Sequence, residues 1–182
     1  MIRQYKYPPV YEWKSLCERP LQNQENLSEQ VKSVFDKVKI NGDKALKFYT
    51  EKFDKVSLED LKVSESEIIE AEQSVSDELK SAIKIASENI RKFHNSQQEE
   101  KKIIETTKGA FCWRESRVIE SIGIYIPGGT APLFSTVLML GIPANIAGCK
   151  NIALCSPPDK NGKINPTILF TANLIGIKNI FK

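Results

Sequence analysis

Apolar residues recur every three or four positions through most of the first hundred residues. This spacing is typical of a helix that buries one face. It predicts a mainly helical N-terminal segment over residues 1–100. The stretches that show the pattern are 27–38, 45–53, 68–75 and 79–93.

Capping residues place the starts and stops of these helices. Asn26 and Ser64 each stand three residues before a glutamate, which is the spacing of a capping box. Ser76 precedes an acidic first turn, and the helix dipole favours negative charge there. The first helix is expected to end at Asn41–Gly42, and Asp43 is expected to cap the second.

From residue 101 onward, short apolar runs alternate with turns. Residues 103–107 and 110–118 predict a β-hairpin that turns at Lys108–Gly109. The rest of the chain predicts alternating strands and helices. Strands are expected at 122–126, 152–155 and 179–182, and helices at 134–147, bent or interrupted by Pro143, and at 166–175.

The pattern G-x-K-N-I occurs twice, beginning at Gly148 and at Gly176. In both copies the glycine is expected to end a helix in the left-handed conformation, with a strand following. Two such units form a β-α-β-α-β arrangement. We therefore expect an α/β fold in which the helical segment over 1–100 leads into a second part over 101–182. This part consists of the β-hairpin and an incomplete Rossmann-like (βαβαβ) parallel sheet, the first half of an NAD-binding domain. Because the last strand would lack its following loop, we expect a fragment truncated at Lys182.

Composition narrows the class of protein. Apolar residues make up 41% and charged residues 27%, as in ordinary globular proteins. The net charge of +3 comes without a dense basic run, so no nucleic-acid partner is expected. The apolar region 133–149 is broken by polar residues, glycine and proline, so no membrane span is expected. The N-terminus has no apolar signal region, and the four cysteines form no CxxC pair, which favours a reduced, cytoplasmic protein.

The segment IYIPGGTAPL, residues 124–133, is the first candidate site. Gly128 and Gly129 are adjacent, so the segment is neither a G-x-G-x-x-G loop nor a Walker loop. One interpretation is a plain turn whose glycines supply positive φ. The other is a ligand loop at the carboxyl end of a parallel strand. Tyr125 is correspondingly either a stacking partner for a flat ligand or a half-buried strand residue.

The remaining reactive side chains favour structural roles. His94 is the single histidine, and its place near the end of a helix favours a hydrogen-bonding role there over a general base. Cys149 and Cys155 lack a neighbour that would stabilise a thiolate. They are interpreted as small buried side chains rather than nucleophiles.

Three separated segments together resemble the histidinol dehydrogenase family. They are NGDKALKFYTEKFD (41–54), ENIRKFHNSQ (88–97) and GIYIPGGTAPLFSTVLMLGIPANIAGCKNIALCSPP (123–158). The resemblance covers the N-terminal portion of the family's chain. It implies a cytoplasmic, homodimeric oxidoreductase with NAD and zinc as cofactors. Such an enzyme oxidises L-histidinol through L-histidinal to L-histidine with two NAD+, at the end of histidine biosynthesis.

When the family's site residues are matched to this sequence by motif, the resemblance assigns Tyr125 to the NAD site. It also places Pro127, Gly128 and Gly129 along the same cofactor. The family's catalytic Glu-His pair and zinc ligands lie later in its chain. The resemblance thus implies no catalytic residue and no metal ligand here, and an inactive fragment. Two alternatives stay open: a non-catalytic nucleotide-binding or interaction module derived from the family's N-terminal half, and a cysteine-dependent aldehyde dehydrogenase.

Overall fold

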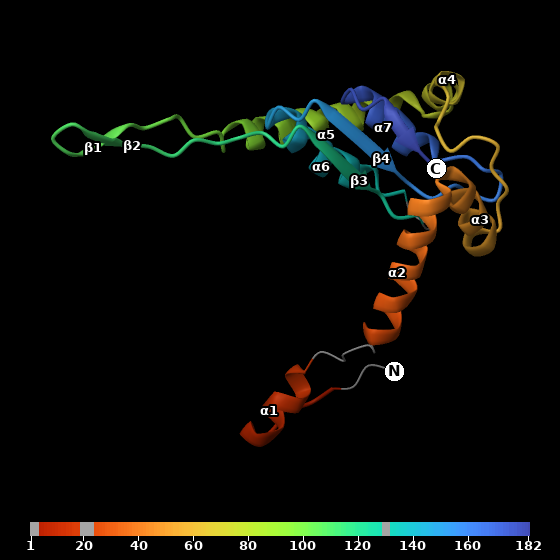
Figure 1. Ribbon diagram of the computed structural model, residues 1–182, viewed down its shortest axis with the longest axis horizontal. Coiled ribbons are helices and arrows are strands. Elements are labelled where there is room, and N and C mark those ends of the chain that lie inside the picture. The colour runs from red at the N-terminus through yellow and green to blue at the C-terminus, as the bar shows by residue number, and fades with distance from the viewer. Residues whose placement is uncertain (1–3, 19–23, 129–131) are drawn as a thin grey trace. The chain divides into compact units, whose positions relative to one another are not determined.

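The computed structural model of the protein describes residues 4–18, 24–128 and 132–182 (Figure 1). The chain divides into two compact units, Met1–Ala45 and Leu46–Lys182. Its elements confirm the predicted α/β class. They are α1 (Val10–Cys17), α2 (Gln24–Asn41), α3 (Asp43–Asp54), α4 (Glu65–Ser74), α5 (Asp77–Asn95), β1 (Ile104–Thr107), β2 (Ala110–Cys112), β3 (Ser121–Tyr125), α6 (Phe134–Ile146), β4 (Asn151–Cys155), α7 (Pro166–Leu174) and β5 (Asn179–Phe181).

Two of the predicted caps are confirmed. Ser64 Oγ accepts from the backbone N–H of Glu67 at 3.2 Å, and Glu67 Oε2 accepts from the backbone N–H of Ser64 at 3.0 Å. These reciprocal bonds form the capping box of α4. Ser76 Oγ likewise accepts from the N–H of Leu79 at the start of α5.

Other predicted boundaries are wrong. Asn26 does not cap α2, because that helix already begins at Gln24. Asp43 is the first residue of α3 rather than its cap, although its carboxylate still stands in the first turn. Helix α1 was not expected: it is short, and its N-cap Pro9 makes no side-chain capping bond.

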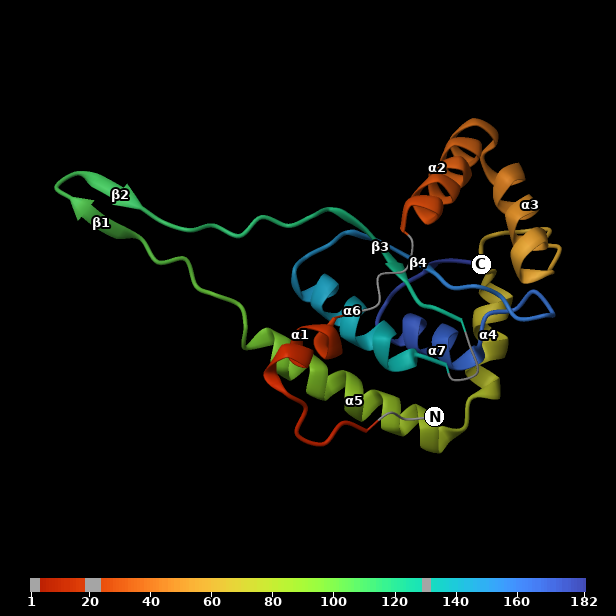
Figure 2. The same cartoon turned by 90° about the horizontal axis from the view of Figure 1, so that it is seen from below.

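Strands β3, β4 and β5 form a parallel sheet in that order, with α6 and α7 as the crossovers. Both helices lie on one side of the sheet (Figure 2). Helix α4 packs on α7, and α5 packs on α6. The core lies between the sheet and these helices, where Ile124, Leu154 and Ile180 are buried. The arrangement is the predicted βαβαβ unit.

Glycine ends both crossover helices as the repeated pattern predicts. The φ angles of Gly148 and Gly176 are 87° and 83°, in the left-handed region. The predicted interruption at Pro143 is wrong, since α6 continues through it. Pro143 has no N–H to donate to the carbonyl of Met139, one turn earlier. Met139 is 50% exposed, so water can reach this part of the helix. No helix among the described residues has the length and apolarity to cross a membrane.

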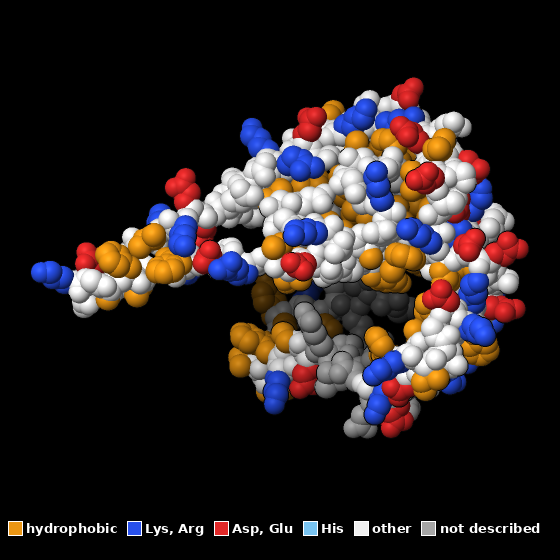
Figure 3. Space-filling view, turned by 45° about the horizontal axis from the view of Figure 1, so that its top comes forward, with side chains coloured by type: hydrophobic (Ala, Val, Ile, Leu, Met, Phe, Trp, Pro, Cys, Tyr) orange, Lys and Arg blue, Asp and Glu red, His pale blue; other side chains and the backbone are white. Residues whose placement is uncertain are grey.

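The hairpin forms as predicted but is shorter. β1 pairs antiparallel with β2, and Gly109 takes a φ of 85° at the turn. The second strand ends at Cys112 instead of Val118. Every residue from 95 to 121 is exposed. Apolar side chains here alternate with charged ones on the surface (Figure 3).

Candidate functional site at the carboxyl edge of the sheet

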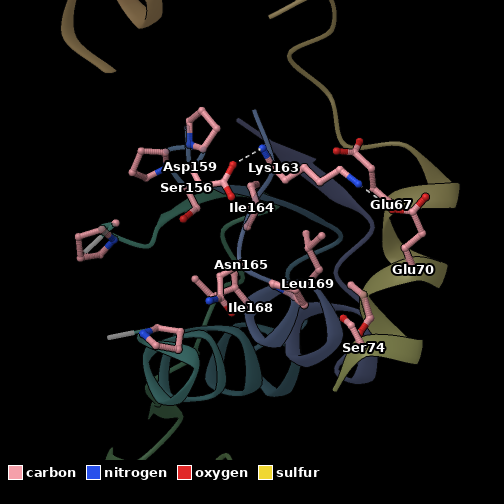
Figure 4. Close-up of a pocket in the computed structure, with 17 residues that line it drawn as sticks. Glu67, Glu70, Ser74, Ser156, Asp159, Lys163, Ile164, Asn165, Ile168 and Leu169 are labelled. Atoms are coloured by element: carbon pink, nitrogen blue, oxygen red, sulfur yellow. Dashed lines mark hydrogen bonds and ion pairs between the residues drawn. The ribbon is translucent and has the colours of Figure 1, made fainter. Parts of the chain in front are cut away.

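A cavity of about 420 Å³ opens at the carboxyl ends of β3 and β4 (Figure 4). Parallel α/β sheets bind their ligands at this edge, and small-molecule sites span about 300–1,000 Å³. One wall is α4, and the opposite wall is the chain between β4 and α7. The lining residues are Glu67, Glu70, Ala71, Ser74, Pro127, Gly128, Pro132, Ser156, Pro157, Pro158, Asp159, Lys163, Ile164, Asn165, Pro166, Ile168 and Leu169.

Two of the predicted cofactor residues, Pro127 and Gly128, line this cavity, whereas Gly129 lies outside the described residues. The interpretation of a plain turn with positive φ does not hold at Gly128, whose φ lies outside the left-handed region. A Cβ at Gly128 would instead lie 2.7 Å from Pro157 Cγ. Glycine is needed there because the loop after β3 and the loop after β4 approach closely and share one side of the cavity.

The N-terminus of α7 also faces the cavity, but its donors are already used. The N–H of Thr167 donates to Asn165 Oδ1 at 2.9 Å. The N–H groups of Ile168 and Leu169 donate to the Asn165 carbonyl at 3.0 and 3.2 Å, and Pro166 has no N–H. A phosphate at this helix end would find no free backbone donor, so the cavity is not a phosphate cradle of the usual kind.

The charged groups around the cavity are mostly acidic. The lining includes the carboxylates of Glu67, Glu70 and Asp159 against the single ammonium group of Lys163. Lys163 Nζ lies 2.8 Å from Glu70 Oε2, and this hydrogen bond raises the pKa of the lysine. Lys163 therefore stays protonated and paired. The excess of carboxylates over ammonium groups favours ligand groups that donate hydrogen bonds, such as sugar hydroxyls, over phosphates.

Glu67 is held by an ion pair and is not poised for proton transfer. Burial by itself raises the pKa of its carboxyl, but hydrogen bonds from Lys182 and Ser64 outweigh this effect and lower the pKa below its usual value. Lys182 Nζ lies 2.7 Å from Glu67 Oε1. The carboxylate is therefore ionised at neutral pH and serves the structure.

Ser156 is a polar group that sequence reasoning missed. The residue is 2% exposed, and its hydroxyl has no hydrogen-bond partner among the described residues. Figure 4 shows Ser156 and Asn165 on the wall opposite α4. A serine after a strand carries no distinctive sequence signal. Its place in the cavity follows from the packing of α4 against α7, which forms the cavity around it.

Tyr125 does not line the cavity. It is the last residue of β3 and is 64% exposed, whereas Ile124 and Ile126 on either side of it are buried toward the helices. Alternation along the strand therefore points Tyr125 to the opposite face of the sheet.

The structure also locates the other reactive side chains. His94 Nδ1 lies 2.7 Å from Gln97 Oε1 at the end of α5, in agreement with the structural interpretation. The interpretation of Cys149 and Cys155 as buried is wrong, because Cys149 is half-buried and Cys155 is exposed. Desolvation by the surrounding atoms nevertheless raises the pKa of the Cys155 thiol, which keeps it protonated at neutral pH.

The family model of histidinol dehydrogenase matches residues 17–182. The chain belongs to the histidinol dehydrogenase family. Histidinol dehydrogenase of Bacteroides thetaiotaomicron is 53% identical over 182 residues, which is all of this chain and 42% of the relative. The Escherichia coli enzyme is 47% identical over 157 residues, 86% of this chain and 35% of the relative.

The solved structures agree. The crystal structure of histidinol dehydrogenase from Elizabethkingia anophelis superimposes with a TM-score of 0.91 and 64% identity, over 96% of this chain and 40% of that chain. The chain thus spans about two fifths of the length of its histidinol dehydrogenase relatives. Every residue that lines the cavity falls inside the range that the family model matches.

Proposed function

We propose that this chain supplies part of the nucleotide-binding site of a histidinol dehydrogenase. The complete enzyme oxidises L-histidinol through L-histidinal to L-histidine with two NAD+, at the end of histidine biosynthesis. The observation that supports this is the cavity at the carboxyl edge of a parallel sheet, in a chain of this family. Tyr125, Pro127, Gly128 and Gly129 are the proposed cofactor contacts.

The described residues suit the nucleoside parts of NAD better than its pyrophosphate. The carboxylates of Glu70 and Asp159 offer acceptors for ribose hydroxyls, and Ser156 offers its hydroxyl. Ile168 and Leu169 give the cavity an apolar side. When bound, NAD+ accepts the hydride that leaves the carbon bearing the alcohol. The residues of this chain bind and orient the cofactor for that transfer.

Zinc, which the family resemblance also implies, does not fit the described residues. Within 4–18, 24–128 and 132–182, no three His, Cys, Asp or Glu side chains gather so that they could hold a metal ion. We therefore propose no zinc ligand and no catalytic acid or base in this chain. The chain by itself is expected to be inactive.

We further propose a cytoplasmic homodimer for the complete enzyme. The fully exposed segment 95–121 supports a protein partner, because it presents large apolar side chains. Phe111 and Trp113 are 56% and 51% exposed. Large apolar side chains exposed close together in the chain favour an interaction site.

The experiment compares the protein expressed from the whole reading frame with the 182-residue chain. NADH formation from L-histidinol and NAD+ is followed in both, and NAD+ binding is measured by calorimetry. We expect the protein from the whole reading frame to form two NADH per histidinol. We expect the 182-residue chain to bind NAD+ without forming NADH. Turnover by the chain would contradict the absence of catalytic groups. Binding without turnover by both would favour a non-catalytic nucleotide-binding module.

A further inference from the structure

Three side chains form one row across the carboxyl edge of the sheet. Tyr125 of β3 pairs with Cys155 of β4, and Cys155 pairs with Phe181 of β5. Paired residues of parallel strands point to the same face. The residues just before them point to the helices and are buried: Ile124, Leu154 and Ile180. Tyr125, Cys155 and Phe181 therefore share the face that carries neither α6 nor α7.

Most of this row is open to solvent, and small residues lie behind its β3 and β4 members. Tyr125 is 64% exposed, Cys155 is exposed and Phe181 is half-buried. Two residues back along the strands, Gly123 pairs with Ala153. A Cβ added at Gly123 would meet nothing within 4 Å. The two aromatic side chains thus stand on either side of a thiol, and the next row back consists of Gly123, Ala153 and Asn179.

The spacing of the two rings suits one flat guest. Neighbouring strands lie about 4.8 Å apart, so Tyr125 and Phe181, two strands apart, are separated by about 9.6 Å. A ring placed midway lies about 4.8 Å from each, within the range of about 4.5–7 Å that aromatic pairs adopt.

We propose that Tyr125 and Phe181 flank an aromatic slot over Cys155 that takes one flat heteroaromatic ring of a nucleotide. This inference rests on the proposed function and extends it by assigning Phe181, and a face of the sheet outside the cavity, to the ligand. The chain that leaves Tyr125 reaches the cavity at Pro127. A dinucleotide can therefore place a ring in the slot and a ribose in the cavity across the carboxyl edge.

Cys155 provides a direct readout of the slot. The 182-residue chain is alkylated with iodoacetamide, and labelling of each cysteine is followed by peptide mass spectrometry. The probes are NAD+, AMP and nicotinamide mononucleotide. A ring over Cys155 should slow its labelling several-fold, while labelling of Cys112, which is exposed in β2, should not change. The half-molecule that protects Cys155 identifies the ring that enters the slot.

Ring-removing variants test the two walls. Phe181→Leu and Tyr125→Leu should each weaken NAD+ binding about 5- to 30-fold, as expected for loss of one stacking partner, and abolish the protection of Cys155. Tyr125→Phe keeps the ring and should retain both. Phe93→Leu, which removes a 62% exposed aromatic ring from α5, is the matched control and should behave like the wild type. Circular dichroism verifies folding, and Tyr125→Leu carries the test where Phe181→Leu does not fold.

Several results would overturn the slot. One is that NAD+ binds but leaves the labelling of Cys155 unchanged. Another is that neither leucine variant weakens NAD+ binding. The proposed function would survive both results. A further contradicting result is that iodoacetamide does not label Cys155 in the protein without nucleotide, because the slot would then be filled by the polypeptide itself. If the wild-type chain binds none of the three nucleotides, the slot and its contribution to the cofactor site fail together.

Discussion

Lys182 Nζ lies 2.7 Å from Glu67 Oε1, and the two side chains are 11% and 17% exposed. Glu67 also closes the capping box of α4, and the backbone N–H of Lys182 donates to the Leu61 carbonyl. One largely buried ion pair therefore fastens β5 to the start of the helix that forms a wall of the cavity. Because little water reaches the pair, removing one partner leaves a charge poorly solvated.

Glu67→Gln is expected to destabilise the chain by about 1–3 kcal/mol, between the values for surface and buried pairs. Glu70→Gln is the matched control on the same helix. Its pair with Lys163 is 64% and 58% exposed and should contribute less than about 1 kcal/mol. Urea unfolding of the two variants measures the difference. Equal losses would show that burial of the Glu67–Lys182 pair contributes nothing.

The same carboxylate predicts a dependence of stability on acid. The folded state lowers the pKa of Glu67 below its ordinary value of 4.5. Its stabilising contribution is therefore complete above pH 4.5 and is lost as the pH falls from there through the lower, folded pKa. Glu67→Gln should flatten the fall in the free energy of unfolding over this window. Urea titrations at a series of pH values, with Glu70→Gln as control, check this; an unchanged slope would contradict it.

Gly128→Ala is expected to push the two loops of the cavity apart. The added Cβ would lie 2.7 Å from Pro157 Cγ, and a proline ring cannot rotate away. Overpacking of this kind costs about 1–3 kcal/mol. Gly123→Ala, whose Cβ meets nothing within 4 Å, should change stability by less than about 0.5 kcal/mol. Thermal unfolding compares the two, and a Gly128 variant as stable as the Gly123 variant would argue against close contact between the loops.

The glycines that end α6 and α7 are expected to resist substitution for a backbone reason. Gly148 and Gly176 have φ angles of 87° and 83°, although a Cβ at Gly176 would meet no atom within 4 Å. Gly176→Ala should therefore cost about 1–2 kcal/mol from left-handed strain alone. Gly176→Asn should cost less, because asparagine tolerates this conformation better. Chemical unfolding of the two Gly176 variants measures these costs. Equal stability of the alanine variant and the wild type would refute the predicted left-handed strain.

Sequence by itself determined the features that depend on neighbours along the chain. The caps at Ser64 and Ser76, the turn at Gly109 and the helix ends at Gly148 and Gly176 are all where the local pattern predicts them. Each arises from bonds or backbone angles within about four residues, so composition and spacing suffice. The alternation of strands and helices likewise predicted the parallel sheet, and the motifs predicted the family.

Tertiary structure decided everything that depends on residues far apart in the chain. The approach of Pro157 to Gly128, the pairing of Glu67 with Lys182 and the exposure of Cys155 follow from how loops and layers pack. The row of Tyr125, Cys155 and Phe181 follows from the register of three strands. The physical reason is that the parallel strands are joined by long crossovers, so their register and the cover of each face are set by packing rather than by local spacing.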